Sequence, residues 1–334
     1  MLNCPFIRQP GPACFRSGVQ HLYRRFIVYS ATSPQPLPAP GLIITPEIRL
    51  QSELYLPFKE LRCLFNRLYR QVLPYPPILT STPFQTCLSW ADCYAGLPSW
   101  LQRSPNPAVL LEQLLVDYPL LTRFVFYSFL PSRFNGAGFG RYPAQLDWLQ
   151  QQLTARSGPL RILDAASGSG EGTWELAELL SRCGRQPEQI QLEGWTLEPL
   201  EVWAAQHQAL PHEPQREQRY QQRVQQLGQQ GWGERVSFQA VDLLGALPGT
   251  PPFDLILCNG LLGGPIISGS EAVRQVLGQL AALLERGGML LVADHFHAGW
   301  KKKLPLGQLR ELVQDAGLQV HQAGEGLVGI KPCT

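Results

Sequence analysis

One short stretch of this chain places an acidic residue and several glycines where they can hold a nucleotide-like ligand. The apolar pair Ile162-Leu163 ends in Asp164, which is followed by small residues, by Gly168 and Gly170, and by an apolar segment of helical character. This pattern predicts a strand, a tight turn and the start of a helix. Glycines let the backbone approach a ligand closely, and a helix N-terminus offers unpaired N–H groups and a partial positive charge. Such an arrangement is typical of nucleotide-type sites.

The spacing of these residues differs from the dinucleotide fingerprint G-x-G-x-x-G. Here the pattern is D-x-A-x-G-x-G-x-G, running from Asp164 through Ala166 to Gly172. It resembles motif I of the class I S-adenosylmethionine (SAM) methyltransferases, with Ala166 in place of the family's first glycine. Residues 165–171, which include Glu171, are similar to the A-x-C-S-x-G-E-E stretch of the chemotaxis receptor glutamate methyltransferases. The resemblance implies SAM as the cofactor.

The resemblance assigns roles around this turn, and a local alternative stands beside two of them. Ala166, Gly168 and Gly170 would line the cofactor. Asp164 would fix the glycine loop or reach the ligand through water, or would simply cap the loop by accepting backbone N–H bonds. Glu171 would contact the methionine amino group of the cofactor, or would only cap a helix whose N-terminus favours a carboxylate.

Acidic residues also follow the second and third expected strands. In the resembling family, an acid at the end of the second strand accepts both ribose hydroxyls, because a carboxylate offers two acceptors. Thr196 aligns with that acid, and Glu198 lies two residues later on the same face, so we expect Glu198 to bind the ribose. Asp242 matches the third-strand acid that meets the adenine amino group, and Leu243 is expected to cover the adenine face.

The fourth expected strand, 253–259, resembles the family stretch F-D-L-I-x-C-R-N as far as Cys258. Asn259 then stands at the family's arginine position and Gly260 at its asparagine position, so the family's asparagine contact does not transfer. Ligands in open α/β sheets bind at the carboxyl ends of strands. We therefore expect Asn259 to border the cofactor cleft.

Two residues are candidates to act on the substrate, although no catalytic residue is assigned. Arg141 loosely resembles the arginine of the chemotaxis family's F-F-R-D/E stretch, which lies over the cofactor carboxylate and the substrate. His295 follows the fifth expected strand near Asp294 and His297. The two histidines lack an evident third ligand, so no metal site is expected.

The elements that must position these residues alternate in type after about residue 159. The sequence predicts strands at 161–165, 191–197, 236–240, 253–259, 288–294, 318–323 and 326–331, and helices at 173–183, 200–208, 272–285 and 306–316. Short apolar strands between helices favour a mostly parallel sheet that is covered on both faces. The expected fold class is α/β, with a Rossmann-like class I methyltransferase sheet whose last strand is antiparallel and with a mostly helical N-terminal region.

Three segments are expected along the chain. Residues 1–45 would be an irregular, Pro-rich extension with a composition like that of a transit peptide, since they contain no Asp or Glu. Residues 46–150 would be mostly helical, with one helix over 46–72, and residues 151–334 would form the SAM-binding methyltransferase domain. The connection at 206–235 is unusually long. It has a helical pattern around residue 220 and no strand pattern for the receptor-docking β subdomain of chemotaxis enzymes, which makes receptor docking doubtful.

Composition narrows the function classes. The 334 residues are 44% hydrophobic and 16% charged, and the net charge of +2 gives no basic footprint for nucleic acid. No apolar run reaches the roughly 18–20 residues of a membrane span, so we expect no membrane partner. Eight scattered cysteines without a C-x-x-C pair argue against zinc and for the free thiols of a cytoplasmic protein.

The sequence therefore predicts a SAM-dependent methyltransferase whose substrate is a small molecule or a protein carboxylate. Two other classes stay open. One is a non-catalytic Rossmann-like module that has lost SAM binding and acts through a protein partner, which is suggested by Thr196 and Gly260 at polar positions of the family. The other is a nicotinamide oxidoreductase, which the loop spacing and Ala166 disfavour.

Overall fold

The chain folds as two compact units, Met1–Phe134 and Asn135–Thr334. The computed structural model describes residues 4–130, 138–264, 266–293 and 304–333. The expected boundary at residue 150 falls inside helix α8 (Pro143–Thr154), which packs against helix α9 (Glu171–Arg182) and strand β6 (Gln319–Ala323) of the second unit. Helix α8 therefore belongs with the sheet.

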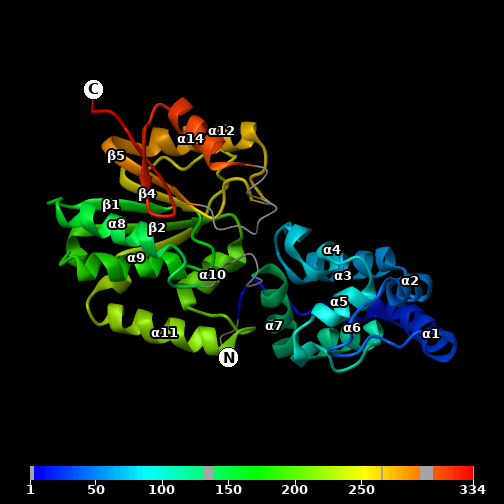
Figure 1. Cartoon of the computed structure of the whole chain (residues 1–334). Coiled ribbons are helices and arrows are strands. Elements are labelled where there is room, and N and C mark those ends of the chain that lie inside the picture. Colours follow the sequence, from blue (N-terminus) through cyan, green and yellow to red (C-terminus); the bar gives the residue numbers. More distant parts are fainter. Residues whose placement is uncertain (1–3, 131–137, 265, 294–303, 334) are drawn as a thin grey trace. The chain divides into compact units, whose positions relative to one another are not determined.

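The described part of the first unit consists of helices and turns (Figure 1). Aromatic side chains fill its core: the rings of Phe65 and Phe84 stack with centroids 3.8 Å apart, and Tyr69 stacks on Phe124 at 5.6 Å. Its elements are η1 (Pro12–Phe15), α1 (Arg16–Thr32), α2 (Pro46–Tyr55), α3 (Phe58–Val72), η2 (Leu79–Ser81), α4 (Pro83–Thr86), α5 (Trp90–Gly96), η3 (Ser99–Leu101), α6 (Pro107–Val116) and α7 (Tyr118–Phe129).

Two expectations for this unit were wrong. Residues 1–45 are not irregular throughout, because α1 buries Val19, Leu22 and Tyr29 against the rest of the unit. The prolines that suggested an irregular chain lie outside α1. Residues 46–72 form two helices rather than one, since Pro57 disfavours the helical conformation of the residue before it and becomes the N-cap of α3.

The second unit is built on one seven-stranded sheet with the order β3-β2-β1-β4-β5-β7-β6. The pairs from β3 to β5 are parallel, and β7 is antiparallel to both of its neighbours. This confirms the expected fold class. The strands are β1 (Leu160–Asp164), β2 (Ile190–Thr196), β3 (Val236–Ala240), β4 (Phe253–Asn259), β5 (Leu284–Ala293), β6 (Gln319–Ala323) and β7 (Gly326–Ile330).

Helices cover both faces of this sheet, which explains why the central strands read as unbroken apolar runs. Figure 1 shows α9, α10 (Pro199–His207) and α11 (Pro214–Gly228) on one face, and α12 (Ser270–Leu283) and α14 (Leu306–Asp315) on the other. The long connection at 206–235 contains α11 and the short η5 (Trp232–Glu234), and no strand. None of the helices among the described residues is both long and apolar enough to cross a membrane.

The strand order fixes where a ligand crevice lies. From β1 the chain proceeds outward to β2 and β3, and from β4 it proceeds in the opposite direction to β5. Neighbouring strands β1 and β4 therefore form the point at which the order reverses. In open α/β sheets this point opens a crevice at the carboxyl ends of the strands, where Asp164 and Asn259 end β1 and β4.

Candidate functional site

The glycine turn after β1 has one open side and one packed side. Gly168 and Gly170 have φ values of +51° and +87°, a region that L side chains rarely adopt. A Cβ added at Gly168 would meet no heavy atom within 4 Å. At Gly170 it would lie 2.6 Å from Ala205 Cβ and 2.7 Å from Tyr220 Oη. The turn thus offers space at Gly168, while Gly170 allows close packing against α10 and α11.

Asp164 holds this turn in place. Its buried carboxylate accepts a 2.7 Å hydrogen bond from the Thr173 hydroxyl and a 3.4 Å bond from the Ala166 N–H. Burial raises the pKa of Asp164 to about 6, against the lowering effect of the two donors. The Ser167 N–H donates to the Trp195 carbonyl at 3.0 Å and ties the turn to β2. These contacts hold the loop, as both the family role and the capping role expected for Asp164 require, and its expected contact with the ligand through water stays a prediction.

Glu171, the first residue of α9, is paired with an arginine that sequence reasoning did not identify. Arg216 Nε donates to Glu171 Oε1 at 2.9 Å, and a terminal guanidinium nitrogen of Arg216 donates to Oε2. The Glu171 side chain is 4% exposed and that of Arg216 is 11% exposed. Burial acts to lower the pKa of Arg216, but the Glu171 and Glu213 carboxylates overcome it and raise the pKa above its usual value. The only signal for this contact in the sequence was the unusual length of the 206–235 connection.

The end of β2 gathers two carboxylates rather than one. Glu198 is buried and caps α10 by accepting the Leu200 N–H at 3.4 Å. Thr196, which aligns with the family's ribose acid, donates its hydroxyl to Glu201. Glu201 was not expected at the site, because the sequence does not show which face of its helix points toward the end of β2. An acid therefore contacts Thr196 from α10.

Asp242 and Leu243, just after β3, have different surroundings. Asp242 is exposed, and one of its carboxylate oxygens accepts the Leu244 N–H at 2.9 Å. No described residue donates a hydrogen bond to the other oxygen. Leu243 is buried and belongs to the hydrophobic core that includes Trp195 and Leu262. Asp242 is thus available to a ligand, whereas Leu243 mainly fills the core.

Asn259 ends β4 and is held by α8. Its amide nitrogen donates to Gln145 Oε1 at 2.6 Å, and Gln145 Nε2 donates back to Asn259 Oδ1 at 3.3 Å. Glu325 in the β6–β7 turn accepts the Ala144 and Gln145 N–H groups at 2.9 and 2.7 Å and so caps α8. Asn259 borders the crevice, but its amide is already engaged by Gln145.

Arg141 reaches the same end of β4. A Cβ added at Gly260 would lie 3.1 Å from both terminal guanidinium nitrogens of Arg141, and Gly260 has a φ of +71°. No hydrogen bond or ion pair joins this guanidinium to another described residue. Gly260 thus leaves room for a half-buried cation at the crevice. His295 lies outside the described residues, as do Asp294 and His297.

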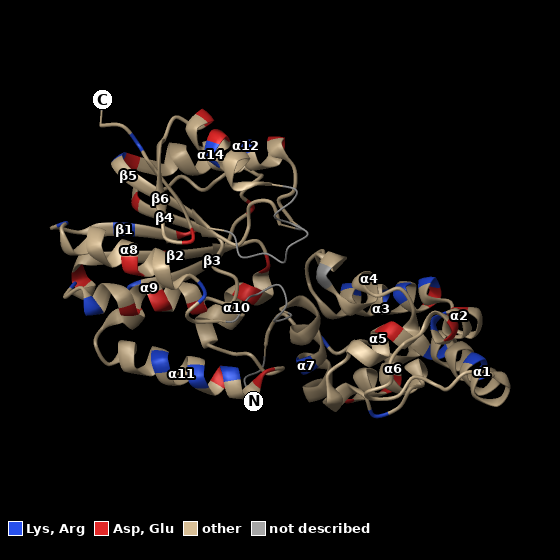
Figure 2. Ribbon diagram, viewed as in Figure 1, with Lys and Arg blue, Asp and Glu red and all other residues tan. Residues whose placement is uncertain are grey.

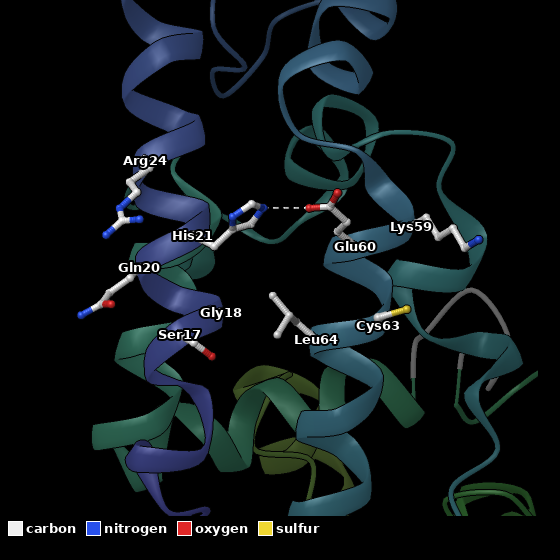
Figure 3. A pocket seen from close by; sticks show the side chains of 9 residues that line it. All are labelled: Ser17, Gly18, Gln20, His21, Arg24, Lys59, Glu60, Cys63 and Leu64. Carbon is white, nitrogen blue, oxygen red and sulfur yellow. Dashed lines mark hydrogen bonds and ion pairs between the residues drawn. The ribbon is translucent and has the colours of Figure 1, made fainter.

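A second hollow, of about 690 Å³, lies in the N-terminal unit between α1 and α3. Figure 3 shows His21 and Glu60 hydrogen-bonded across it, while Arg24 and Lys59 point away from each other. Because its cations do not converge, this groove is not a built anion site. Among the described residues, no group of three or more His, Cys, Asp or Glu side chains can hold a metal ion, and all eight cysteines are free.

Solved structures that are similar to this chain include methyltransferases, which match it at low sequence identity. No protein-family profile and no curated protein matches the chain. An O-methyltransferase family protein from Burkholderia thailandensis is 19% identical, with a TM-score of 0.43 over 95% of this chain and 94% of its own. Magnesium protoporphyrin IX methyltransferase from Synechocystis PCC 6803, solved with bound SAM, is 18% identical, with a TM-score of 0.39 over 65% of this chain and 98% of its own.

Not every similar structure is described as a methyltransferase. The cyclase SpnF is 20% identical, with a TM-score of 0.34 over 53% of this chain. The match spans 58% of the cyclase's own length.

Proposed function

We propose that the second unit is a SAM-dependent methyltransferase. The observation that carries the proposal is the glycine turn after β1, which lies where the strand order reverses between β1 and β4 and has free space at Gly168. Acidic residues follow the next two strands of the sheet, β2 and β3. Motif I supports the proposal through its resemblance to class I methyltransferases. The exposed carboxylate of Asp242 and the buried carboxylate of Glu198 lie after β3 and β2, on the side to which an adenosine would extend.

The described residues fit the adenosine end of this cofactor. Asp242 would accept a hydrogen bond from the adenine amino group at the carboxylate oxygen that Leu244 does not use. Glu198 would accept hydrogen bonds from the ribose hydroxyls, and Glu201 lies nearby, in contact with Thr196. The backbone at Gly168 would allow close approach. At the amino acid end, Glu171 would hold the ammonium group and Arg141 would hold a carboxylate of the cofactor or of the substrate.

When bound, the cofactor supplies a methyl group on a positively charged sulfur. The task of the chain is then to align donor and acceptor, which can contribute roughly 7–11 kcal/mol. A carboxylate acceptor needs no general base, whereas an amine or a hydroxyl can require one. The acceptor remains a small molecule or a protein carboxylate, and Arg141 beside Gly260 is the residue we assign to orienting it.

Two contacts favour a second candidate, a non-catalytic module that acts through a protein partner. The Glu171 carboxylate is already neutralised by Arg216, and the Asn259 amide is already satisfied by Gln145. Internal partners of this kind are what a fold that no longer binds its ligand would retain. A ligand that competes with them would favour the enzyme instead.

Isothermal titration of the full chain with SAM, S-adenosylhomocysteine and NADH tests the proposal. We expect micromolar binding of the first two ligands, which corresponds to about −8 kcal/mol, and no heat from NADH. A folded protein that binds neither SAM nor S-adenosylhomocysteine would favour the non-catalytic module. Binding of NADH alone would indicate an oxidoreductase.

A further inference from the structure

Helix α11 covers the glycine turn with two of its side chains. Arg216, in its first turn, pairs with Glu171, and Tyr220, one turn later, donates its buried hydroxyl to the Ser169 carbonyl at 3.0 Å. Figure 2 marks the basic positions along this helix, which are Arg216, Arg219 and Arg223. Of these three, Arg216 is the one that pairs with the carboxylate at the start of α9.

Among the described residues, one cation contacts the carboxylate of Glu171, and this side chain is buried. Arg216 engages both carboxylate oxygens, and the Ser169 hydroxyl donates to Oε2 at 3.0 Å. On another side lies Gly138, where an added Cβ would collide with Glu171 Oε1. A buried carboxylate needs a compensating partner. Among the residues that the structure describes, the guanidinium holds both oxygens of Glu171, so a second cation that takes these oxygens must displace it.

We infer that Arg216 occupies the position on Glu171 that the ammonium group of the cofactor takes, so that cofactor and Arg216 compete for this carboxylate. The inference rests on the proposed function. An ammonium group carries the same charge as the guanidinium and donates hydrogen bonds to the same two oxygens. The Glu171–Arg216 pair thus gives the buried carboxylate of Glu171 a positive partner until the cofactor arrives.

The released arginine keeps a partner. Arg216 also donates to Glu213 at 2.8 Å, one turn earlier at the start of α11. This second contact lies away from Glu171 and at a more exposed carboxylate. The ion pair with Glu171 can consequently open without leaving the guanidinium uncompensated, and the exchange needs only a rearrangement at the first turn of α11.

Two substitutions and two ligands test the competition. Arg216→Gln removes the competing charge, and Arg219→Gln removes an exposed charge from the same helix as a matched control. S-adenosylhomocysteine carries the ammonium group, whereas 5′-methylthioadenosine has the adenosine and the sulfur but no amino acid end. We expect Arg216→Gln to bind S-adenosylhomocysteine about tenfold tighter than the wild type, because a charge-assisted contact no longer has to be broken. Binding of 5′-methylthioadenosine should not change, and Arg219→Gln should leave both affinities unchanged.

Arg216→Lys covers the case in which Arg216→Gln does not fold, since lysine keeps the charge but lacks the two-pronged geometry. It should tighten S-adenosylhomocysteine binding by a smaller factor. Equal or weaker binding by a folded Arg216 variant would overturn the competition and leave the proposed function standing. If neither ligand binds the wild type or any variant, the proposed function itself is overturned.

Discussion

The Thr173 hydroxyl donates a 2.7 Å hydrogen bond to the buried carboxylate of Asp164 and so ties the end of β1 to the first turn of α9. This contact closes the glycine turn at its base, because the intervening residues 165–172 then span a fixed distance. The same carboxylate accepts the Ala166 N–H inside the turn. Asp164 thus organises the backbone that the proposed cofactor would approach.

The pKa of Asp164 predicts a pH dependence of folding. Burial raises this pKa from its ordinary value of 3.8 to about 6, so between these values the folded state binds more protons than the unfolded state. The free energy of unfolding contributed by Asp164 should therefore fall as pH rises from about 4 to about 6, by at most about 3 kcal/mol. Asparagine mimics the neutral acid and removes this dependence. Urea unfolding of the wild type and of Asp164→Asn at pH 4, 5, 6 and 7 measures it, and a stability difference that stays constant over that range would contradict the assignment.

A side chain added at Gly168 and one added at Gly170 should lower the free energy of unfolding by different amounts. Gly168→Ala adds a methyl group in open space and should destabilise through backbone strain alone, by about 1 kcal/mol. Gly170→Ala adds the same strain and also a collision with Ala205 and Tyr220, and should cost at least about 2 kcal/mol more. Denaturant midpoints of the two variants provide the comparison. Equal losses would mean that the packed side of the turn is wrongly assigned.

Asp242 is the acid whose removal should affect binding without affecting the fold. Its side chain is exposed and accepts only a local hydrogen bond from the Leu244 N–H, so Asp242→Ala should leave the melting temperature within a few degrees of the wild type. Loss of its contact with the adenine amino group should weaken S-adenosylhomocysteine binding about tenfold or more. Asp315→Ala, at an exposed acid of α14, is the matched control. The assignment fails if calorimetry gives both variants the affinity of the wild type.

Two substitutions at the end of β2 test whether Glu198 or Thr196 binds the ribose. Glu198→Gln should weaken S-adenosylhomocysteine binding by about tenfold or more, since it removes a charged acceptor. Thr196→Val should weaken binding less, because Thr196 contacts Glu201 and the proposal places no ligand atom on it. Titrations of the two variants side by side decide the order. The reverse ranking would place the ribose on Thr196 and Glu201 and would overturn the role given to Glu198.

The sequence predicted most of the strands of the sheet, because a short apolar run between turn residues is typical of a buried strand and is too short for a helix. The strand expected at 253–259 is β4 without change, and the hairpin expected around Gly324 joins β6 to β7. The sequence also predicted the turn at 164–171, since a strand end followed by glycines and a helix start is a local signal.

The side-chain contacts that Glu171 and Asn259 make within the protein were not predictable in the same way. Glu171 and Arg216 are 45 positions apart, and Asn259 and Gln145 are 114 apart. Arg216 and Gln145 lie in helices with many polar side chains, and polarity alone does not indicate which of them turns inward. Helix α1 was missed for a different reason, because the prolines on both sides of it suggested an irregular chain.

Amide hydrogen exchange of the full chain, with and without saturating S-adenosylhomocysteine, tests most directly whether the cofactor binds at the carboxyl ends of β1 to β3. We expect slower exchange at residues 165–171 and 242–245 and unchanged exchange in the helices of residues 16–129. No slowing at residues 165–171, or slowing confined to the first unit, would contradict it.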